Sequence, residues 1–126
     1  MSNLPIRIDE ADGVWPPDNY TGEWAYHWPN RQLKYHALYL NGKTEGEVLC
    51  YWDNGQLAQR GISEAGVCRG VWTDYFEAGA KFKETDYTDN TNFTIRYFGP
   101  GGDILRTEVW QDGDIVREEG EDLLAE

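Results

Sequence analysis

Glycines recur through this chain at a fixed interval of 24 residues. The interval separates Gly22, Gly46 and Gly70, and it also separates Gly55 from Gly79. Other positions repeat at the same spacing, namely Gly42 and Gly66, Tyr51 and Tyr75, Trp52 and Phe76, and Trp24, Val48 and Trp72. A period between about 20 and 50 residues indicates one supersecondary unit that is copied and stacked. Stacked units form a continuous surface, which suits binding to another molecule.

Between the glycines, aromatic and polar residues alternate in the way that half-buried strands require. Trp24, Tyr26 and Trp28 alternate with polar or small residues, and similar alternation follows in later copies. Asn54-Gly55, Asn41-Gly42 and Asp112-Gly113 are typical of tight hairpin turns, which need positive φ, and Ala78-Gly79 and Gly101-Gly102 fill equivalent places. The sequence therefore predicts strands near 23–28, 33–40, 47–52, 56–62, 70–76, 81–87, 92–98 and 103–110.

Two features of the turns depart from a strict repeat. The first copy has Arg31 where later copies have glycine, so we expect Asn30 to adopt the left-handed conformation there. In the unit around Gly55, the apolar residue Leu57 follows the turn glycine by two positions. Phe82 and Ile104 instead follow the turn glycines at positions 79 and 101 by three positions. Because a slip of one residue turns side chains to the other face, we expect repairing bulges near Ala80 and Gly102.

The chain of 126 residues predicts a single domain, 1–126, in three parts. Residues 1–20 are an irregular entry segment in which Trp15 and Tyr20 cap the open end of the first repeat. Residues 21–115 hold the repeats, and residues 116–126 form an acidic tail. The only candidate helix is a short acidic one at Glu118–Glu126.

The formal net charge is −12, from 23 acidic and 11 basic residues. A surface this negative disfavours nucleic acid and the anionic inner leaflet of membranes, and it attracts proteins with a basic surface. The charge alternatively serves solubility alone. The N-terminal sequence shows neither a basic region nor an apolar stretch typical of a signal peptide, so we expect a cytoplasmic protein.

The residue types that carry chemistry are sparse and scattered, so we expect no enzyme, no metal and no cofactor. His27 and His36 are the only histidines, and ordinary cross-strand positions explain them better than a shared metal. Cys50 and Cys68 lack the spacing of a metal or redox motif and are expected as reduced, half-buried thiols. The glycines at 99, 101 and 102 lack the lysine and helix of a phosphate-binding loop.

Acidic residues gather near the C-terminus, where nine acids face two arginines between residues 103 and 126. Such a stretch is usually solvated, or it alternatively reaches a basic cleft of a partner. The candidate partner-binding residues are Asp103, Glu108, Asp112, Asp114, Glu118 and Glu119.

The segment Gly46–Leu57, with the sequence GEVLCYWDNGQL, resembles the G-x-W-x-x-Y-Y-x-N-G-x-L unit of MORN-variant repeats. The same frame recurs from Gly22 and Gly70, and Tyr39–Gly46 resembles the family's linking Y-x-N-G-x-x-x-G. The resemblance covers roughly residues 20–115. It implies an elongated, curved antiparallel sheet of successive β-hairpins, and it brings no catalytic residues.

Small bacterial members of this family are associated with YwqK-type antitoxins and with immunity proteins against secreted toxins. The resemblance therefore implies a protein that binds a cognate toxin and occludes its active site or substrate path, with a toxin acting on nucleic acid as one possibility. The alternative is an acidic protein-interaction scaffold, or a phage-type inhibitor of a host defence protein.

Overall fold

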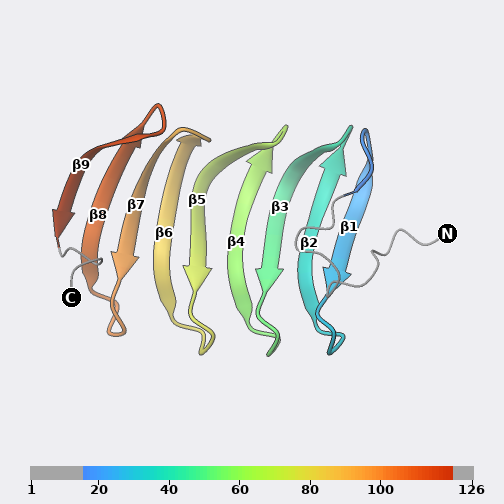
Figure 1. The fold of residues 1–126 in the computed structure, drawn as a ribbon, viewed down its shortest axis with the longest axis horizontal. Coiled ribbons are helices and arrows are strands. Elements are labelled where there is room, and N and C mark those ends of the chain that lie inside the picture. Colours follow the sequence, from blue (N-terminus) through green and yellow to red (C-terminus); the bar gives the residue numbers. More distant parts are fainter. Residues whose placement is uncertain (1–15, 121–126) are drawn as a thin grey trace.

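A computed structural model describes residues 16–120, and every regular element in that range is a β-strand (Figure 1). The strands form one antiparallel sheet in which each pairs with its neighbours in sequence. Their bounds are β1 (Gly22–His27), β2 (Leu33–Leu40), β3 (Lys43–Tyr51), β4 (Leu57–Glu64), β5 (Val67–Tyr75), β6 (Lys81–Asp89), β7 (Asn92–Phe98), β8 (Ile104–Gln111) and β9 (Asp114–Gly120). The predicted all-β fold of successive hairpins is confirmed.

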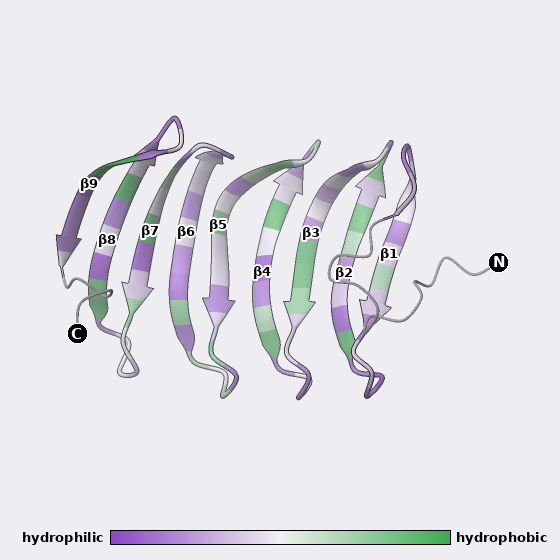
Figure 2. Ribbon diagram, viewed as in Figure 1, coloured by the Kyte–Doolittle hydropathy of each residue, from purple (hydrophilic) through white to green (hydrophobic). Residues whose placement is uncertain are grey.

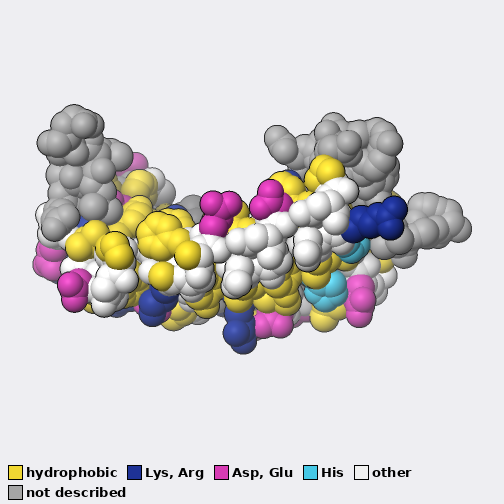
Figure 3. All heavy atoms as spheres, turned by 90° about the horizontal axis from the view of Figure 1, so that it is seen from below, with side chains coloured by type: hydrophobic (Ala, Val, Ile, Leu, Met, Phe, Trp, Pro, Cys, Tyr) yellow, Lys and Arg dark blue, Asp and Glu magenta, His cyan; other side chains and the backbone are white. Residues whose placement is uncertain are grey.

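The sheet is open and mildly curved, with β1 and β9 as its two edges (Figures 1 and 3). Eight of its strands match the predicted ranges closely, but the sequence analysis does not predict β9. The helix expected at Glu118–Glu126 is wrong for residues 118–120, which belong to β9, and residues 121–126 lie outside the described part. The turn at Asp112-Gly113 returns the chain along β8, and β9 pairs the backbone groups on the edge of β8 that does not face β7.

One end of the sheet, the lower end in Figure 1, consists of four five-residue loops, and we call it the loop end. The loops are Trp28–Gln32, Trp52–Gln56, Phe76–Ala80 and Gly99–Asp103. In each loop the first N–H donates to the fifth carbonyl oxygen at 2.7 to 2.8 Å. The fourth residue has a positive φ, at Arg31, Gly55, Gly79 and Gly102.

The expectation that Asn30 adopts the left-handed conformation is therefore wrong. Arg31 does so itself, with a φ of 76°. Asn30 instead accepts a hydrogen bond from the N–H of Gln32 at 2.9 Å, and Asn54 makes the equivalent bond in the next loop. The asparagine side chain thus fixes the turn as an acceptor, and the next residue takes the unfavourable φ.

The bulges expected near Ala80 and Gly102 do not repair a slip, because all four loop-end hairpins contain the same bulge. The strand leaving each loop carries one unpaired residue, and these residues are Lys34, Ala58, Phe82 and Leu105. Phe82 is simply the bulge residue of its copy. In the fourth loop the residue with positive φ is Gly102, so Ile104 lies two positions after it, as the repeat requires.

At the opposite end, which we call the turn end, hairpins close through two-residue turns. Asn41-Gly42, Ala65-Gly66 and Asp112-Gly113 have positive φ at both residues, as type I′ turns require. The turn between β6 and β7 differs, since Asp89 organises it with its side chain. The Asp89 carboxylate accepts the N–H groups of Thr91 at 3.0 Å and Asn92 at 2.9 Å, and these bonds lower its pKa.

The core lies on one face of the sheet, which we call the aromatic face. Its buried cluster comprises Trp24, Tyr26, Tyr35, Ala37, Tyr39, Val48 and Trp72. The predicted equivalence of Trp24, Val48 and Trp72 is confirmed, since all three are buried. Tyr20 packs edge-on against Trp24, as expected for a residue that caps the first repeat. Trp15, the other residue expected in this cap, lies outside the described residues.

A glycine makes room for the largest core side chain. A Cβ atom at Gly61 would lie 1.9 Å from the Trp72 ring, so the indole rests directly on the backbone of β4. The Trp72 Nε1 then donates to the carbonyl oxygen of Ile62 at 3.0 Å. Only glycine therefore fits at position 61 as long as the Trp72 indole lies against β4.

Candidate protein-interaction surfaces

The six acids predicted to bind a partner do not form one patch. Asp103 closes the last loop at the loop end, whereas Asp112 and Asp114 lie at the turn end. Glu108 and Glu118 pair across β8 and β9 on the aromatic face, and Glu119 is on the opposite face. The structure thus divides these residues among four places, namely the two ends and the two faces of the sheet.

Arg106 forms ion pairs with two of the six carboxylates, those of Glu108 and Glu118. Its Nε lies 2.7 Å from Glu108 Oε2, and its Nη2 donates a hydrogen bond to Glu118 Oε1. These two carboxylates raise the pKa of Arg106. Trp110 also donates its Nε1 hydrogen to Glu108 at 3.0 Å. Glu108 and Glu118 are therefore engaged within β8 and β9, and the other four predicted acids are the better candidates for a partner.

Cross-loop hydrogen bonds tie the first three loops together at the loop end. Trp28 Nε1 donates to the carbonyl oxygen of Tyr51 at 3.0 Å, and Trp52 Nε1 repeats the bond to Tyr75 at 3.1 Å. Two asparagines make a second series at the same spacing: the side-chain amide of Asn30 donates to the backbone carbonyl oxygen of Asp53, and that of Asn54 donates to the backbone carbonyl oxygen of Glu77. Trp52 thus contacts the next hairpin, as its place in the repeat predicts.

The cross-loop series ends at the third loop. There Phe76 replaces tryptophan and Ala78 replaces asparagine, and neither side chain has a hydrogen to donate. Phe76 instead packs on the bulge residue Phe82, with ring centroids 4.9 Å apart. The third and fourth loops therefore lack the side-chain bonds that join the earlier ones.

Apolar side chains are exposed where the series ends. Phe76 is 42% exposed and packs on half-buried Phe82. Ile104 is 56% exposed and pairs with half-buried Phe98 on the opposite face of the sheet. Figure 3 looks onto this end and shows hydrophobic side chains gathered on the side of the later strands. The sequence shows that Phe76 occupies the same repeat position as Trp52. It does not show that Phe76 is exposed, because that depends on the missing cross-loop bonds.

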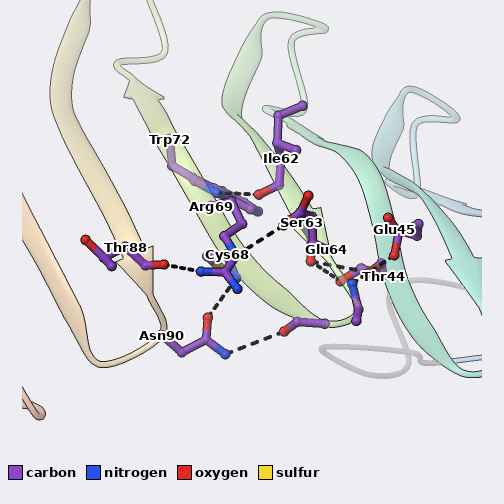
Figure 4. Close-up of polar contacts among 12 residues, drawn as sticks. Thr44, Glu45, Ile62, Ser63, Glu64, Cys68, Arg69, Trp72, Thr88 and Asn90 are labelled. Atoms are coloured by element: carbon purple, nitrogen blue, oxygen red, sulfur yellow. Dashed lines mark hydrogen bonds and ion pairs between the residues drawn. The ribbon is translucent and has the colours of Figure 1, made fainter.

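The turn end is tied together more evenly (Figure 4). The N–H of Gly66 donates to the carbonyl oxygen of Thr44 at 2.9 Å, and Ala65 N–H donates to Glu45. Across the next gap, Asn90 accepts the N–H of Cys68 at 2.8 Å and Arg69 donates to the Thr88 carbonyl oxygen. The break in side-chain bonding thus belongs to the loop end.

The aromatic face also carries a polar pair, Gln59 and Asp74. Gln59 Nε2 donates to Asp74 Oδ1 at 2.8 Å, and burial raises the pKa of this carboxyl above its ordinary value. Cys50 lies next to the pair, and burial raises the pKa of its thiol to about 11. Cys50 and Cys68 are free thiols, as expected. A protonated thiol is a poor nucleophile, and burial keeps the Cys50 thiol in this form at neutral pH.

The described residues contain no group of three or more His, Cys, Asp or Glu side chains placed to hold a metal ion. His36 lies 3.7 Å from Glu23, whereas His27 pairs with Leu33 in the sheet register. Among residues 16–120 no helix is long and apolar enough to cross a membrane. No protein-family model, curated protein or solved structure matches the chain significantly.

Proposed function

We propose that this protein is an immunity protein, or antitoxin, that binds a cognate bacterial toxin and blocks its active site or substrate path. The observation that carries the proposal is an open sheet whose two ends display exposed carboxylates, in a chain with a net charge of −12. The resemblance of its repeats to MORN-variant proteins supports the same function. The proposed partner is a protein with a basic surface.

Inhibition follows from charge and shape, without a chemical step by this chain. Complementary charge raises the association rate of the two proteins. Once bound over the cleft of the toxin, this protein keeps the substrate out. Regular hairpins keep the carboxylates of the loops in fixed relative positions, so little order is lost on binding. A toxin that acts on nucleic acid fits best, because its cleft must itself attract phosphates.

Co-expression with the toxin candidate encoded directly beside this gene tests the proposal. Cells that produce both proteins should grow, whereas cells that produce the candidate alone should stop growing. A charge-matched, unrelated acidic protein is the control for nonspecific neutralisation. If the cells die equally fast with and without this protein, the immunity function is wrong, and the scaffold or host-directed inhibitor replaces it.

The purified pair gives a second measurement. Binding should saturate at one-to-one or a simple multiple, and the association rate should fall as salt rises above physiological strength, where the Debye length is about 8 Å. An association rate independent of salt contradicts the role given to the negative charge.

A further inference from the structure

We propose that a patch on the face opposite the aromatic face is the docking surface for the toxin. We call it the outer patch, and its apolar members, one from each of β2–β5, are Leu38, Leu49, Ile62 and Val71. It receives a surface of the toxin that presents an apolar side chain between basic groups. This inference rests on the proposed function and adds the place of contact and the chemistry of the surface bound.

Strand register places the four apolar side chains on one face. Each is next in sequence to a buried residue of the row that crosses the aromatic face, namely Ala37, Val48, Gly61 and Trp72. Because successive residues of a strand point to opposite faces, all four neighbours of this row point away from the aromatic core.

The outer patch is continuous across the four strands. A Cβ atom at Gly46 in β3 would lie 3.9 Å from Cδ1 of Leu38 in β2. The next residue, Glu47, pairs with Ile62 in β4, and Ile62 lines one groove together with Val71 in β5. The apolar side chains therefore belong to one surface.

This surface leaves apolar area open to solvent. Leu38 is 43% exposed, Ile62 is 46% exposed and Val71 is 49% exposed, while Leu49 between them is half-buried. Exposed apolar side chains scattered singly carry little meaning, but a contiguous patch is typical of a surface that binds another protein.

The groove between β4 and β5 provides a place for an anchoring side chain. It opens where the register shifts, because Gly61 alone in β4 faces Gly70–Trp72 in β5. Ile62 and Val71 line it together with Thr73 and Tyr75. The groove thus offers apolar walls and two side-chain hydroxyl groups, which is the combination of a desolvated pocket and polar contacts found at the centre of protein interfaces.

Charges inside the patch balance one another. Arg60 Nε lies 3.0 Å from Glu47 Oε2. Arg69 Nε lies 3.3 Å from Glu64 Oε1. Both arginines are therefore already paired with carboxylates of this chain, and the centre of the patch is close to neutral.

Acids flank the patch on both sides. Glu23 in β1 pairs with Leu38, and Asp86 in β6 pairs with Val71, and both acids are exposed on the same face as the patch. A second copy of this chain carries the same acids and the same net charge of −12, which disfavours it as the occupant. A basic protein complements these flanks.

The flanking acids also set the spacing of the basic groups. Five strand intervals separate β1 from β6, which corresponds to about 24 Å at the usual distance between strands. The toxin would therefore present lysine or arginine side chains on both sides of its apolar side chain, over a span of this order. A cleft that binds nucleic acid contains basic groups over such a span, and covering them excludes the substrate.

Two pairs of substitutions test the apolar centre against the protein encoded beside this gene. Ile62→Ser with Val71→Ser removes the walls of the groove, and Ile104→Ser with Val116→Ser is the control at similar exposure, 56% and 54%. We expect the outer-patch variant to bind at least about tenfold more weakly than the wild type, and the control within about twofold. Thermal unfolding of each variant verifies that it is folded.

Charge reversal tests the flanks and leaves the apolar residues unchanged. Glu23→Lys with Asp86→Lys and Asp112→Lys with Asp114→Lys change the net charge equally, the first pair beside the patch and the second at the turn end. We expect the first reversal to slow association by roughly tenfold, and the second to have a much smaller effect.

The outcomes separate the two proposals. If the wild type neither binds nor protects, the immunity function and the docking surface both fail. If the wild type protects and both outer-patch variants bind and protect equally well, the docking surface alone is wrong. Sedimentation of the wild type gives a further check, since a dimer that Ile62→Ser with Val71→Ser converts to a monomer would show that a second copy occupies the patch.

Discussion

Strands β1–β5 and strands β6–β9 share one backbone plan but differ in how their side chains are buried. All seven residues of the buried cluster lie in β1, β2, β3 and β5. Among the described residues of the later strands only Thr85 and Ile95 are buried in the sheet, and every residue of β9 is exposed. Figure 2 shows the same contrast, with more hydrophobic colour in β2–β4 than in β9.

The difference shows that the later strands keep the hairpin geometry of the early strands although their side chains are less tightly packed. The fourth loop keeps the hydrogen bond, the positive φ and the bulge of the first three. Backbone pairing and turn residues maintain the register, whereas burial of aromatic area supplies most of the stability. The early strands therefore stabilise the sheet, and the later strands depend on them. Four pairs of substitutions test this contrast.

The largest expected difference is between two tryptophans on the aromatic face. Trp72→Ala removes a buried ring and a hydrogen bond to Ile62, and should cost about 3–5 kcal/mol of unfolding free energy. Trp110→Ala removes a half-buried ring stacked on Phe93, and should cost about 1–2 kcal/mol. Urea denaturation measures both values, and equal costs would contradict the contrast.

Two glycines give the next test. Gly61→Val puts a branched side chain into the Trp72 ring, which must move, and should destabilise by about 3 kcal/mol. Gly101→Val is the control, because nothing lies within 4 Å of a Cβ at that position, and its cost should stay within about 0.5 kcal/mol. A tolerated valine at position 61 would mean that Trp72 does not lie on β4.

Cross-loop hydrogen bonds should have a smaller effect. Trp52→Phe deletes the bond to the Tyr75 carbonyl oxygen and should cost about 1 kcal/mol. The reverse exchange at the equivalent position, Phe76→Trp with Ala78→Asn, should extend the series to the fourth loop and raise the melting temperature by a few degrees. If Phe76→Trp with Ala78→Asn lowers the melting temperature, the third and fourth loops are not spaced as the first three are.

The smallest effect concerns two aspartates whose pKa values shift in opposite directions. Burial raises the pKa of Asp74, so its contribution to stability is fully present below about pH 3.8 and is lost as pH rises through the raised value. Hydrogen bonds in the β6–β7 turn lower the pKa of Asp89, so its contribution is present above about pH 3.8 and is lost as pH falls through the lowered value.

Asp74→Asn should therefore stabilise the protein at neutral pH and lose this advantage in acid. Asp89→Ala should destabilise it at neutral pH and approach the wild type in acid. Chemical denaturation between about pH 3 and pH 7 measures both trends. Parallel stability curves for the two variants would show that the carboxyl groups do not titrate in these environments.

Much of the fold is predictable from the sequence because repetition reinforces each local signal. Asn41-Gly42 and Asp112-Gly113 specify their turns directly, and the positions of Trp24, Val48 and Trp72 correctly indicate one buried row. Arg31 misleads, because arginine rarely adopts a positive φ and the neighbouring asparagine is the better candidate on intrinsic preference. The loop geometry shared by all four copies overrides that preference.

The candidate surface is less predictable. Acidic composition indicates a basic partner, but it does not show that Arg106 engages Glu108 and Glu118 or that Asp112 and Asp114 lie far along β8 from Asp103. These facts depend on strand register, in which alternate residues occupy opposite faces. β9 is also absent from the sequence prediction, because its many charges are typical of a solvated segment as well as of an edge strand.

Hydrogen exchange of backbone amides tests the central contrast most directly, because it reports stability strand by strand. Amides that pair β2 with β3 and β3 with β4 should require an opening free energy larger by about 2 kcal/mol or more than amides that pair β8 with β9. Protection of β8 and β9 equal to that of β2 and β3 would contradict the account, since the later strands would then be as stable as those that contain the aromatic core.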